Sequence, residues 1–171
     1  MSLSFRNAVS CFLLSALSLA GPLAQAQQRQ PAKIKASAIQ VMMIQSDKVT
    51  VPAEFQVSLY EELIDQLRQK GDFARVYRDG DRNAATVPDL IVLQCTVESF
   101  KQGSEKTRQV TTVAGATSIT LRCQFKDERG NSLLERNITG KVRFFGGNLK
   151  ATYDFAKKAA SAAGENFGSR N

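Results

Sequence analysis

The side chains that most often carry chemistry in enzymes are scarce in this chain. The sequence has no histidine, which excludes Ser-His-Asp and Cys-His catalysis and any histidine-ligated metal. Only two of its 3 cysteines, Cys95 and Cys123, lie beyond the N-terminal segment, and their wide separation does not match the CxxC spacing of a zinc site. Gly115 and the glycines at 146–147 lack the surroundings of a phosphate-binding loop. We therefore expect neither a metal nor a cofactor.

Carboxylates are the remaining groups that could act as general acids or bases. Candidates near predicted strand ends or in loops, where catalytic residues often lie, are Asp47, Asp79, Asp81 and Glu98. No motif pairs them, and carboxylates in such places are more often solvated loop residues or helix caps. We therefore expect a protein that is not an enzyme, with a carboxylate-dependent hydrolase as the alternative.

A second set of candidate residues is basic. Lys101, Lys106 and Arg108 lie in a connection, residues 101–117, that is longer than the roughly two to five residues of most hairpin loops. Long loops often bind ligands, so these side chains could dock an anionic head group or a partner protein. The alternative is a solvated connection without a binding role.

Cys95 and Cys123 could instead form a disulfide. Opposed residues of an antiparallel hairpin have a constant index sum, and the sum of 218 centres the connection on Gln109, within residues 101–117. The two cysteines should therefore face each other. A disulfide suits them only at a non-hydrogen-bonded pair, with Cα atoms about 4.5 Å apart. Otherwise they are two buried thiols that pack as small apolar side chains.

The N-terminal segment predicts where these residues work. Arg6 precedes an apolar run, residues 8–20, which is too short to span a bilayer and ends at a Gly-Pro pair. The small-residue motif at 24–26 then predicts cleavage between Ala26 and Gln27.

A lipoprotein is the alternative, because Cys11 follows small residues. However, Cys11 precedes most of the apolar run, whereas a lipidated cysteine must follow it. We expect a soluble periplasmic or secreted protein that has no lipid anchor and no transmembrane span after processing.

Removal of residues 1–26 from the 171-residue chain takes away one charged residue, Arg6, and leaves 22 basic and 16 acidic residues, a formal charge of +6. An exported chain meets phosphates mainly on lipids, so we expect no nucleic-acid partner. The alternative is that the excess charge only maintains solubility.

We divide the chain after the signal peptide into a flexible leader, residues 27–35, a single domain, 36–168, and a short tail, 169–171.

The domain must hold the candidate residues on a sheet and two helices. A nearly continuous apolar run at 38–44 predicts a strand covered on both faces, which we place centrally in the sheet. Pro52 is suited to start a helix that ends at Gly71, for which we expect a left-handed backbone conformation. The apolar stripe of this helix recurs every four residues, at Phe55, Leu59, Leu63 and Leu67. Residues 73–78 predict the next strand.

Alternation with period two then predicts three antiparallel strands. Two begin near residues 88 and 117, a turn follows at 127–131, and the third strand covers 133–145. A helix over 148–167 should start with Asn148 as N-cap and pack closely on the sheet through small side chains. Its predicted apolar face comprises Leu149, Tyr153, Ala156, Ala160, Ala163 and Phe167. The fold class is α+β, a two-layer sandwich of order β-α-β-β-β-β-α with both helices on one mixed or antiparallel sheet.

Residues 38–167 resemble the exported bacterial domain of unknown function 4410 family. The helix ends in the Gly-x-Phe-x-x-Val pattern of that family at Gly71, Phe73 and Val76, and residues 127–130 are similar to its Asp-x-x-x-Gly turn, shortened by one residue. Arg108 corresponds to an arginine of the long loop, whereas the glycine-rich entry to the following strand is reduced to residues 114–116.

The resemblance implies an envelope protein without an established activity, often a lipoprotein. It also implies a fold similar to the N-terminal domain of the Tol-system periplasmic protein and to the curli-secretion lipoprotein. We expect a non-catalytic module that binds an envelope protein or an anionic envelope surface. Besides the hydrolase, the alternative is a secreted inhibitor or binding module that acts on another protein.

The mature protein is expected to begin at Gln27 and to carry no lipid. Intact-mass measurement of protein from the periplasmic fraction checks this. A mass that includes an acylated Cys11, or the mass of the uncut chain, would contradict it.

Overall fold

The computed structural model describes residues 32–104, 106–107, 115–142 and 147–168. The predicted signal peptide, its cleavage site between Ala26 and Gln27, and the tail at 169–171 lie outside the described residues. The described residues belong to one compact unit.

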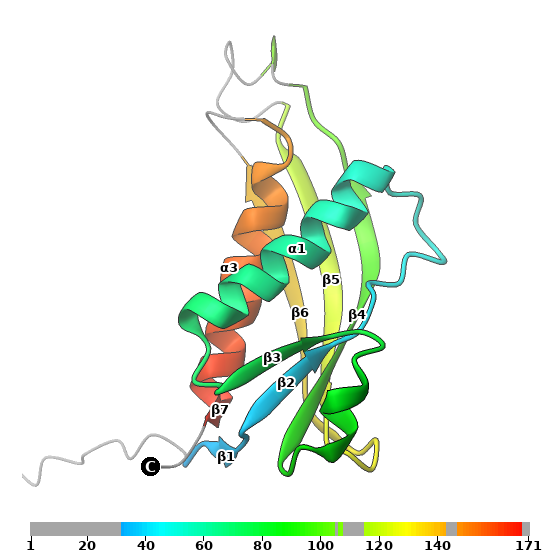
Figure 1. The fold of residues 1–171 in the computed structure, drawn as a ribbon. Helices are drawn as coiled ribbons and strands as arrows, with labels where there is room; N and C mark the ends of the chain where they lie inside the picture. Colours follow the sequence, from blue (N-terminus) through cyan, green and yellow to red (C-terminus); the bar gives the residue numbers. More distant parts are fainter. Residues whose placement is uncertain (1–31, 105, 108–114, 143–146, 169–171) are drawn as a thin grey trace, which may run out of the picture. The chain divides into compact units, whose positions relative to one another are not determined.

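Two helices cover one face of a five-stranded mixed sheet with the strand order β3-β2-β4-β5-β6 (Figure 1). The helices are α1 (Ala53–Lys70) and α3 (Lys150–Asn166). The strands are β2 (Ala38–Val41), β3 (Arg75–Arg78), β4 (Leu90–Lys101), β5 (Thr117–Lys126) and β6 (Ser132–Val142). β2 is parallel to β3 and β4, whereas β4, β5 and β6 are antiparallel. The predicted α+β sandwich and its order of elements are confirmed.

β2 lies inside the sheet, between β3 and β4, although β4 and not β2 is the middle strand. It is covered on both faces, as its apolar run predicts. Ile39 and Val41 face the helices, while Ala38 packs in a smaller cluster with Tyr77, Ala84 and Leu90. Ala84 comes from the short 3-10 helix η1 (Arg82–Thr86), which follows β3.

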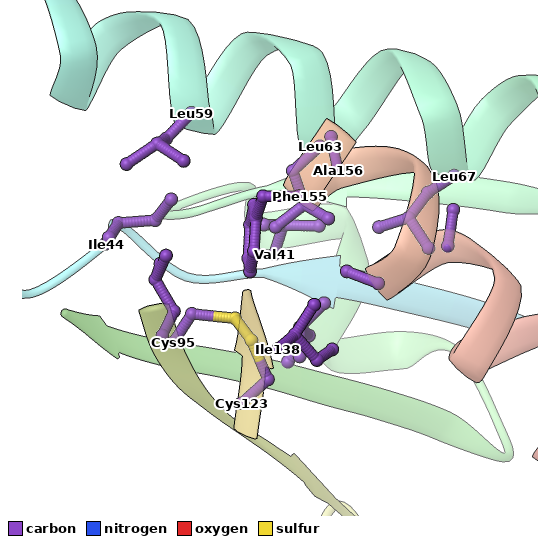
Figure 2. Packing of buried hydrophobic residues seen from close by; sticks show 14 of the residues in the cluster. Val41, Ile44, Leu59, Leu63, Leu67, Cys95, Cys123, Ile138, Phe155 and Ala156 are labelled. Carbon is purple, nitrogen blue, oxygen red and sulfur yellow. A yellow bond between two sulfur atoms is a disulfide. The ribbon is translucent and has the colours of Figure 1, made fainter. Parts of the chain in front are cut away.

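α1 buries the predicted stripe completely, and Figure 2 shows Leu59, Leu63 and Leu67 pointing from this helix toward the sheet. The expectation for Gly71 is wrong, because its backbone is extended, with φ −77° and ψ 142°. The position requires glycine for another reason. A Cβ atom there would collide with the carbonyl oxygen of Leu67 and lie 2.7 Å from the Phe73 ring.

α3 approaches the sheet closely through its alanines. Ala156, Ala160 and Ala163 are fully buried, and a Cβ atom on Gly140 of β6 would collide with the carbonyl oxygen of Ala151. Two predictions at the start of this helix are wrong. Asn148 is not the N-cap, because Leu149 takes that position without a side-chain cap hydrogen bond. The apolar face is also rotated, so that Thr152, Phe155 and Ala159 are buried, whereas Leu149 and Tyr153 are exposed.

Residues at the two ends of the domain form a second, two-stranded sheet. β1 (Ile34–Lys35) is parallel to β7 (Phe167–Gly168). Both residues of β1 lie within the predicted flexible leader, residues 27–35, and that prediction is wrong for them. Each of the two paired strands has only two residues. A strand this short is too brief to show an alternation of apolar and polar residues in the sequence.

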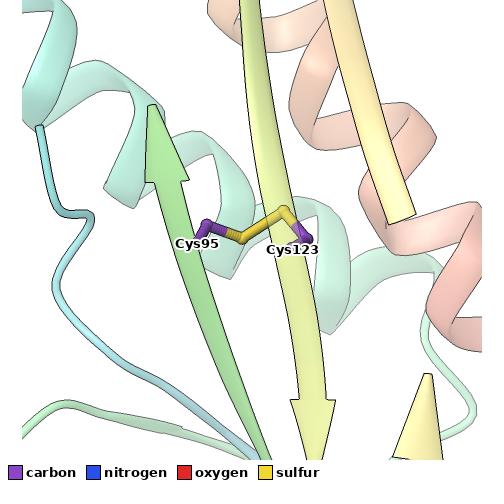
Figure 3. Close-up of a disulfide and its surroundings, with 2 residues drawn as sticks. All are labelled: Cys95 and Cys123. Carbon is purple, nitrogen blue, oxygen red and sulfur yellow. A yellow bond between two sulfur atoms is a disulfide. The ribbon is translucent and has the colours of Figure 1, made fainter. Parts of the chain in front are cut away.

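Cys95 and Cys123 face each other across β4 and β5, as the index sum predicts, with Cα atoms 4.2 Å apart. The carbonyl of Cys95 accepts a hydrogen bond from the backbone N–H of Gln45, on the β2 side, at 3.0 Å. Cys95 therefore forms a non-hydrogen-bonded pair with Cys123, the type that suits a disulfide. The Sγ atoms are joined in a disulfide (Figure 3), inside the core between the sheet and the helices (Figure 2).

Peptide mapping without reductant is expected to recover Cys95 and Cys123 in one linked peptide pair. The bond closes a segment with a sequence separation of 28 residues. Loop-closure entropy therefore predicts that reduction lowers the free energy of unfolding by about 3 to 4 kcal/mol. Denaturant unfolding with and without reductant measures this change. The Cys95→Ala, Cys123→Ala double variant is the control, since reductant should not affect it. Equal stability of the unmodified protein under both conditions would contradict the prediction.

Candidate functional site

The candidate carboxylates have separate structural surroundings. Asp79 accepts a hydrogen bond from the backbone N–H of Met43 at 3.0 Å, and Asp81 caps η1 by accepting from the Asn83 N–H at 3.0 Å. Glu98 lies 3.3 Å from the guanidinium of Arg122 on the next strand, and Asp47 is exposed in the segment after β2. Among the described residues, no three Asp, Glu or Cys side chains gather in a group that could hold a metal ion.

The basic loop begins at the end of β4. Lys101 is the last residue of that strand, and both Lys101 and Lys106 are exposed. Arg108 lies outside the described residues, so its place relative to the two lysines stays a prediction.

A chain of hydrogen bonds joins the base of this loop to the start of α3. The hydroxyl of Thr117, which is fully buried, accepts from the backbone N–H of Gly103 at 3.0 Å and donates to the side-chain oxygen of Asn148 at 2.7 Å. The backbone at Gly103 also contacts that of Gly115 and Ala116 so closely that a Cβ atom on Gly103 would collide with both. The polar side chain of Asn148 is therefore used to link two segments instead of capping the helix.

These contacts define one end of the domain, which we call the loop pole; it consists of Lys101, Gly103, Lys106, Thr117 and residues 148–150. Figure 1 shows that the ends of the β4–β5 connection and the start of α3 lie at the same end of the sheet. Lys150 is exposed there as well. None of the three lysines forms an ion pair with any residue that the structure describes. In the part of the chain that the structure describes, the loop pole therefore presents three lysines that no ion pair neutralises.

A cavity of about 460 Å³, which no pattern in the sequence predicts, lies at the opposite end of the sheet. Its lining comes from β1, the start of β4 and the β5–β6 turn, and comprises Ile34, Lys35, Pro88, Asp89, Leu90, Ile91, Asp127, Glu128, Arg129 and Leu133. Asp89 forms an ion pair with Lys35 at 2.8 Å and has a φ of 56°, and Glu128 accepts from the Leu90 N–H at 3.1 Å. The cavity could not be predicted because its wall includes β1.

Two carboxylates, Glu61 on α1 and Asp127 in the lining of the cavity, have perturbed pKa values. A side-chain hydrogen bond from Arg78, at 2.6 to 2.7 Å, lowers the pKa of Glu61 below its ordinary value. This ion pair joins β3 to α1. Hydrogen bonds from the side chain and backbone of Asn131 lower the pKa of Asp127, which holds the β5–β6 turn together. Both shifts have structural causes, and neither residue has the raised pKa typical of a carboxylic general acid.

No helix among the described residues has the length and apolar character needed to cross a membrane.

No protein-family model and no curated protein matches the chain. Its fold is similar to that of solved structures of PelC from Paraburkholderia phytofirmans, described as a dodecamer. One such structure is 17% identical, with a TM-score of 0.58, and the match covers 83% of this chain and 94% of that chain.

A point variant of the PelC dodecamer is 18% identical over 79% of this chain and 94% of that chain, with a TM-score of 0.57. A hypothetical protein from Chlamydia trachomatis is 9% identical over 74% of this chain and 93% of that chain, with a TM-score of 0.48. At these identities the PelC structures show the fold alone.

Replacement of Thr117 by Val is expected to loosen the loop pole, because the methyl group fills the space of the hydroxyl but cannot bond Gly103 or Asn148. Losing these buried hydrogen bonds should lower the free energy of unfolding by about 1 to 3 kcal/mol. Hydrogen exchange should accelerate at residues 102–104 and 148–150. Thr139→Val is the control, since the Thr139 hydroxyl bonds Thr120 at 2.9 Å on the half-exposed sheet face. Unchanged exchange at the loop pole in Thr117→Val would contradict the predicted role.

Proposed function

We propose that this chain is an exported, non-catalytic module that binds, or helps to assemble, a component of the bacterial cell envelope through its loop pole. The N-terminal sequence, with predicted cleavage between Ala26 and Gln27, supports the location. Membership of the domain of unknown function 4410 family is part of the same proposal and rests on the resemblance of residues 38–167.

The observation that carries the proposed binding role is the group of lysines at the loop pole that have no ion-pair partner among the described residues. Lys101, Lys106 and Lys150 gather there without acidic partners among the described residues, whereas the candidate catalytic carboxylates have other roles or lie apart. An exposed cation that is not neutralised by an ion pair attracts an external anion more strongly than a paired cation does. The loop pole is therefore better suited to bind a ligand than to catalyse a reaction.

The fold supports assembly as a further part of this role. The PelC structures that share it are dodecamers. A fold does not fix a function, so the likeness adds less to the proposal than the charge of the loop pole does.

Replacing Lys101, Lys106 and Arg108 together with Ser is expected to weaken binding to an isolated envelope fraction. Each basic residue near an anionic surface contributes about 1 kcal/mol, so affinity at low salt should fall by about 100-fold. Stability should change by less than about 0.5 kcal/mol, because exposed charges contribute little to it. Cosedimentation at two salt concentrations measures both the affinity and its salt dependence.

A matched control removes the same charge elsewhere. Lys70, Arg82 and Arg129 are exposed and lie outside the loop pole, and their replacement by Ser should leave most of the binding intact. If both triple variants lose affinity equally, net charge and not the loop pole is responsible. If neither variant changes affinity or salt dependence, the loop is a solvated connection.

A further inference from the structure

The first turn of α3 exposes two large apolar side chains beside the lysines of the loop pole. Leu149 is 42% exposed and Tyr153 is 45% exposed. Four residues apart on one helix, they project from neighbouring positions on the same side. Asn148, which Thr117 holds at the base of the basic loop, directly precedes Leu149. Leu149 and Tyr153 therefore lie beside Lys150 at the start of α3, at the end of the sheet where β4 ends (Figure 1).

The charges around this pair favour an anionic partner. Lys150 lies between the two apolar residues in sequence, and Lys157, four residues after Tyr153, is also exposed and has no ion pair among the described residues. The nearest carboxylate in the sequence, Asp154, is already engaged. It forms an ion pair with Lys158 at 2.7 Å and accepts from the Lys141 N–H at 2.9 Å. No free acidic group on this part of α3 offsets the lysines.

We propose that the loop pole docks on an anionic lipid surface, with Leu149 and Tyr153 inserted among the head groups and Lys101, Lys106 and Lys150 on the lipid phosphates. This inference rests on the proposed function and names its partner. Aromatic residues with a polar tip favour the interface between head groups and acyl chains, and lysine reaches phosphate while its methylene stem stays in apolar surroundings. Apolar insertion and positive charge together supply the two signals that stable membrane contact needs.

The mixture of side chains favours lipid over a protein partner. Lysine is depleted in the cores of protein interfaces, where aromatic residues and arginine are enriched. Here three lysines accompany only two exposed apolar side chains. Such a surface is typical of peripheral membrane contact, in which the apolar residues enter a fluid layer and need no complementary pocket.

The chain has no tryptophan, so one introduced indole reports on a single position. Tyr153→Trp places it on α3, next to the loop pole. Met43→Trp is the matched control, because Met43 is 57% exposed and lies beside Asp79, away from α3. With vesicles of phosphatidylglycerol and phosphatidylcholine, the emission of Tyr153→Trp should shift to shorter wavelength, whereas that of Met43→Trp should not. Vesicles of phosphatidylcholine alone should shift neither.

Further substitutions in the Tyr153→Trp background separate charge from insertion. Lys101→Ser with Lys106→Ser should reduce partitioning about 25-fold, which is about fivefold for each lysine. Leu149→Ser should reduce it about tenfold, because an inserted apolar side chain is lost. Val57→Ser is its control, since Val57 is 63% exposed on α1 and should have no effect. Circular dichroism and a thermal melt confirm that each variant is folded.

Three outcomes would overturn the inference, and they differ in what they mean for the proposed function. Binding to phosphatidylglycerol vesicles without an emission shift or a Leu149→Ser effect would leave a charged contact but remove insertion. Binding only to a protease-sensitive component of the envelope fraction would make the partner a protein, and the proposed function would stand. Binding to neither vesicles nor the envelope fraction would remove both proposals.

Discussion

The register between β4 and β5 is the constraint on which the rest of the domain depends. Side chains alternate between the two faces of a strand, so a slip of one residue would send the core side chains of β4 into solvent. From Val92 to Val97 the paired residues keep the index sum of 218 that aligns Cys95 with Cys123. Beyond a bulge between Val97 and Ser99 the sum becomes 219. This change turns Phe100 toward the helices, where its ring centroid lies 4.9 Å from that of Phe55, and leaves Lys101 exposed at the loop pole.

Much of the fold could be predicted because its signals are periodic and local. The stripe of α1, the alternation of β4 and β5, and the β5–β6 turn with Gly130 at φ 82° each follow from a few neighbouring residues. The errors occur where a distant contact decides. Asn148 has the composition of an N-cap, yet its side chain bonds Thr117, which lies 31 residues earlier. The bulge in β4 breaks the alternation only through two consecutive polar residues, Glu98 and Ser99, a pattern that the end of a strand would also give.

The candidate site could be predicted only as a set of residue types. Loop length and basic composition pointed to Lys101 and Lys106, but the exposure of Leu149 and Tyr153 depends on how α3 is rotated. Close contact with Gly140 fixes that rotation, since only a glycine there lets the backbone of the helix approach β6. The cavity beside β1 depends on a pairing of two short strands from opposite ends of the domain. Neither feature has a signal that a window of neighbouring residues contains.

The helix-free face of β4, β5 and β6 is polar, yet most of its groups already have partners within the sheet. Gln124 donates to Glu135 at 2.6 Å, Lys126 donates to Gln94 at 2.8 Å, and these cross-strand contacts add stability to the meander. A ligand that bound this face would have to replace hydrogen bonds already made, so its net gain would be small. The lysines of the loop pole form no such bonds with the residues that the structure describes. Because the polar groups of the sheet face bond one another, the loop pole is the better place for a ligand to bind. The lysines there are exposed, and Thr117 holds the chain in place.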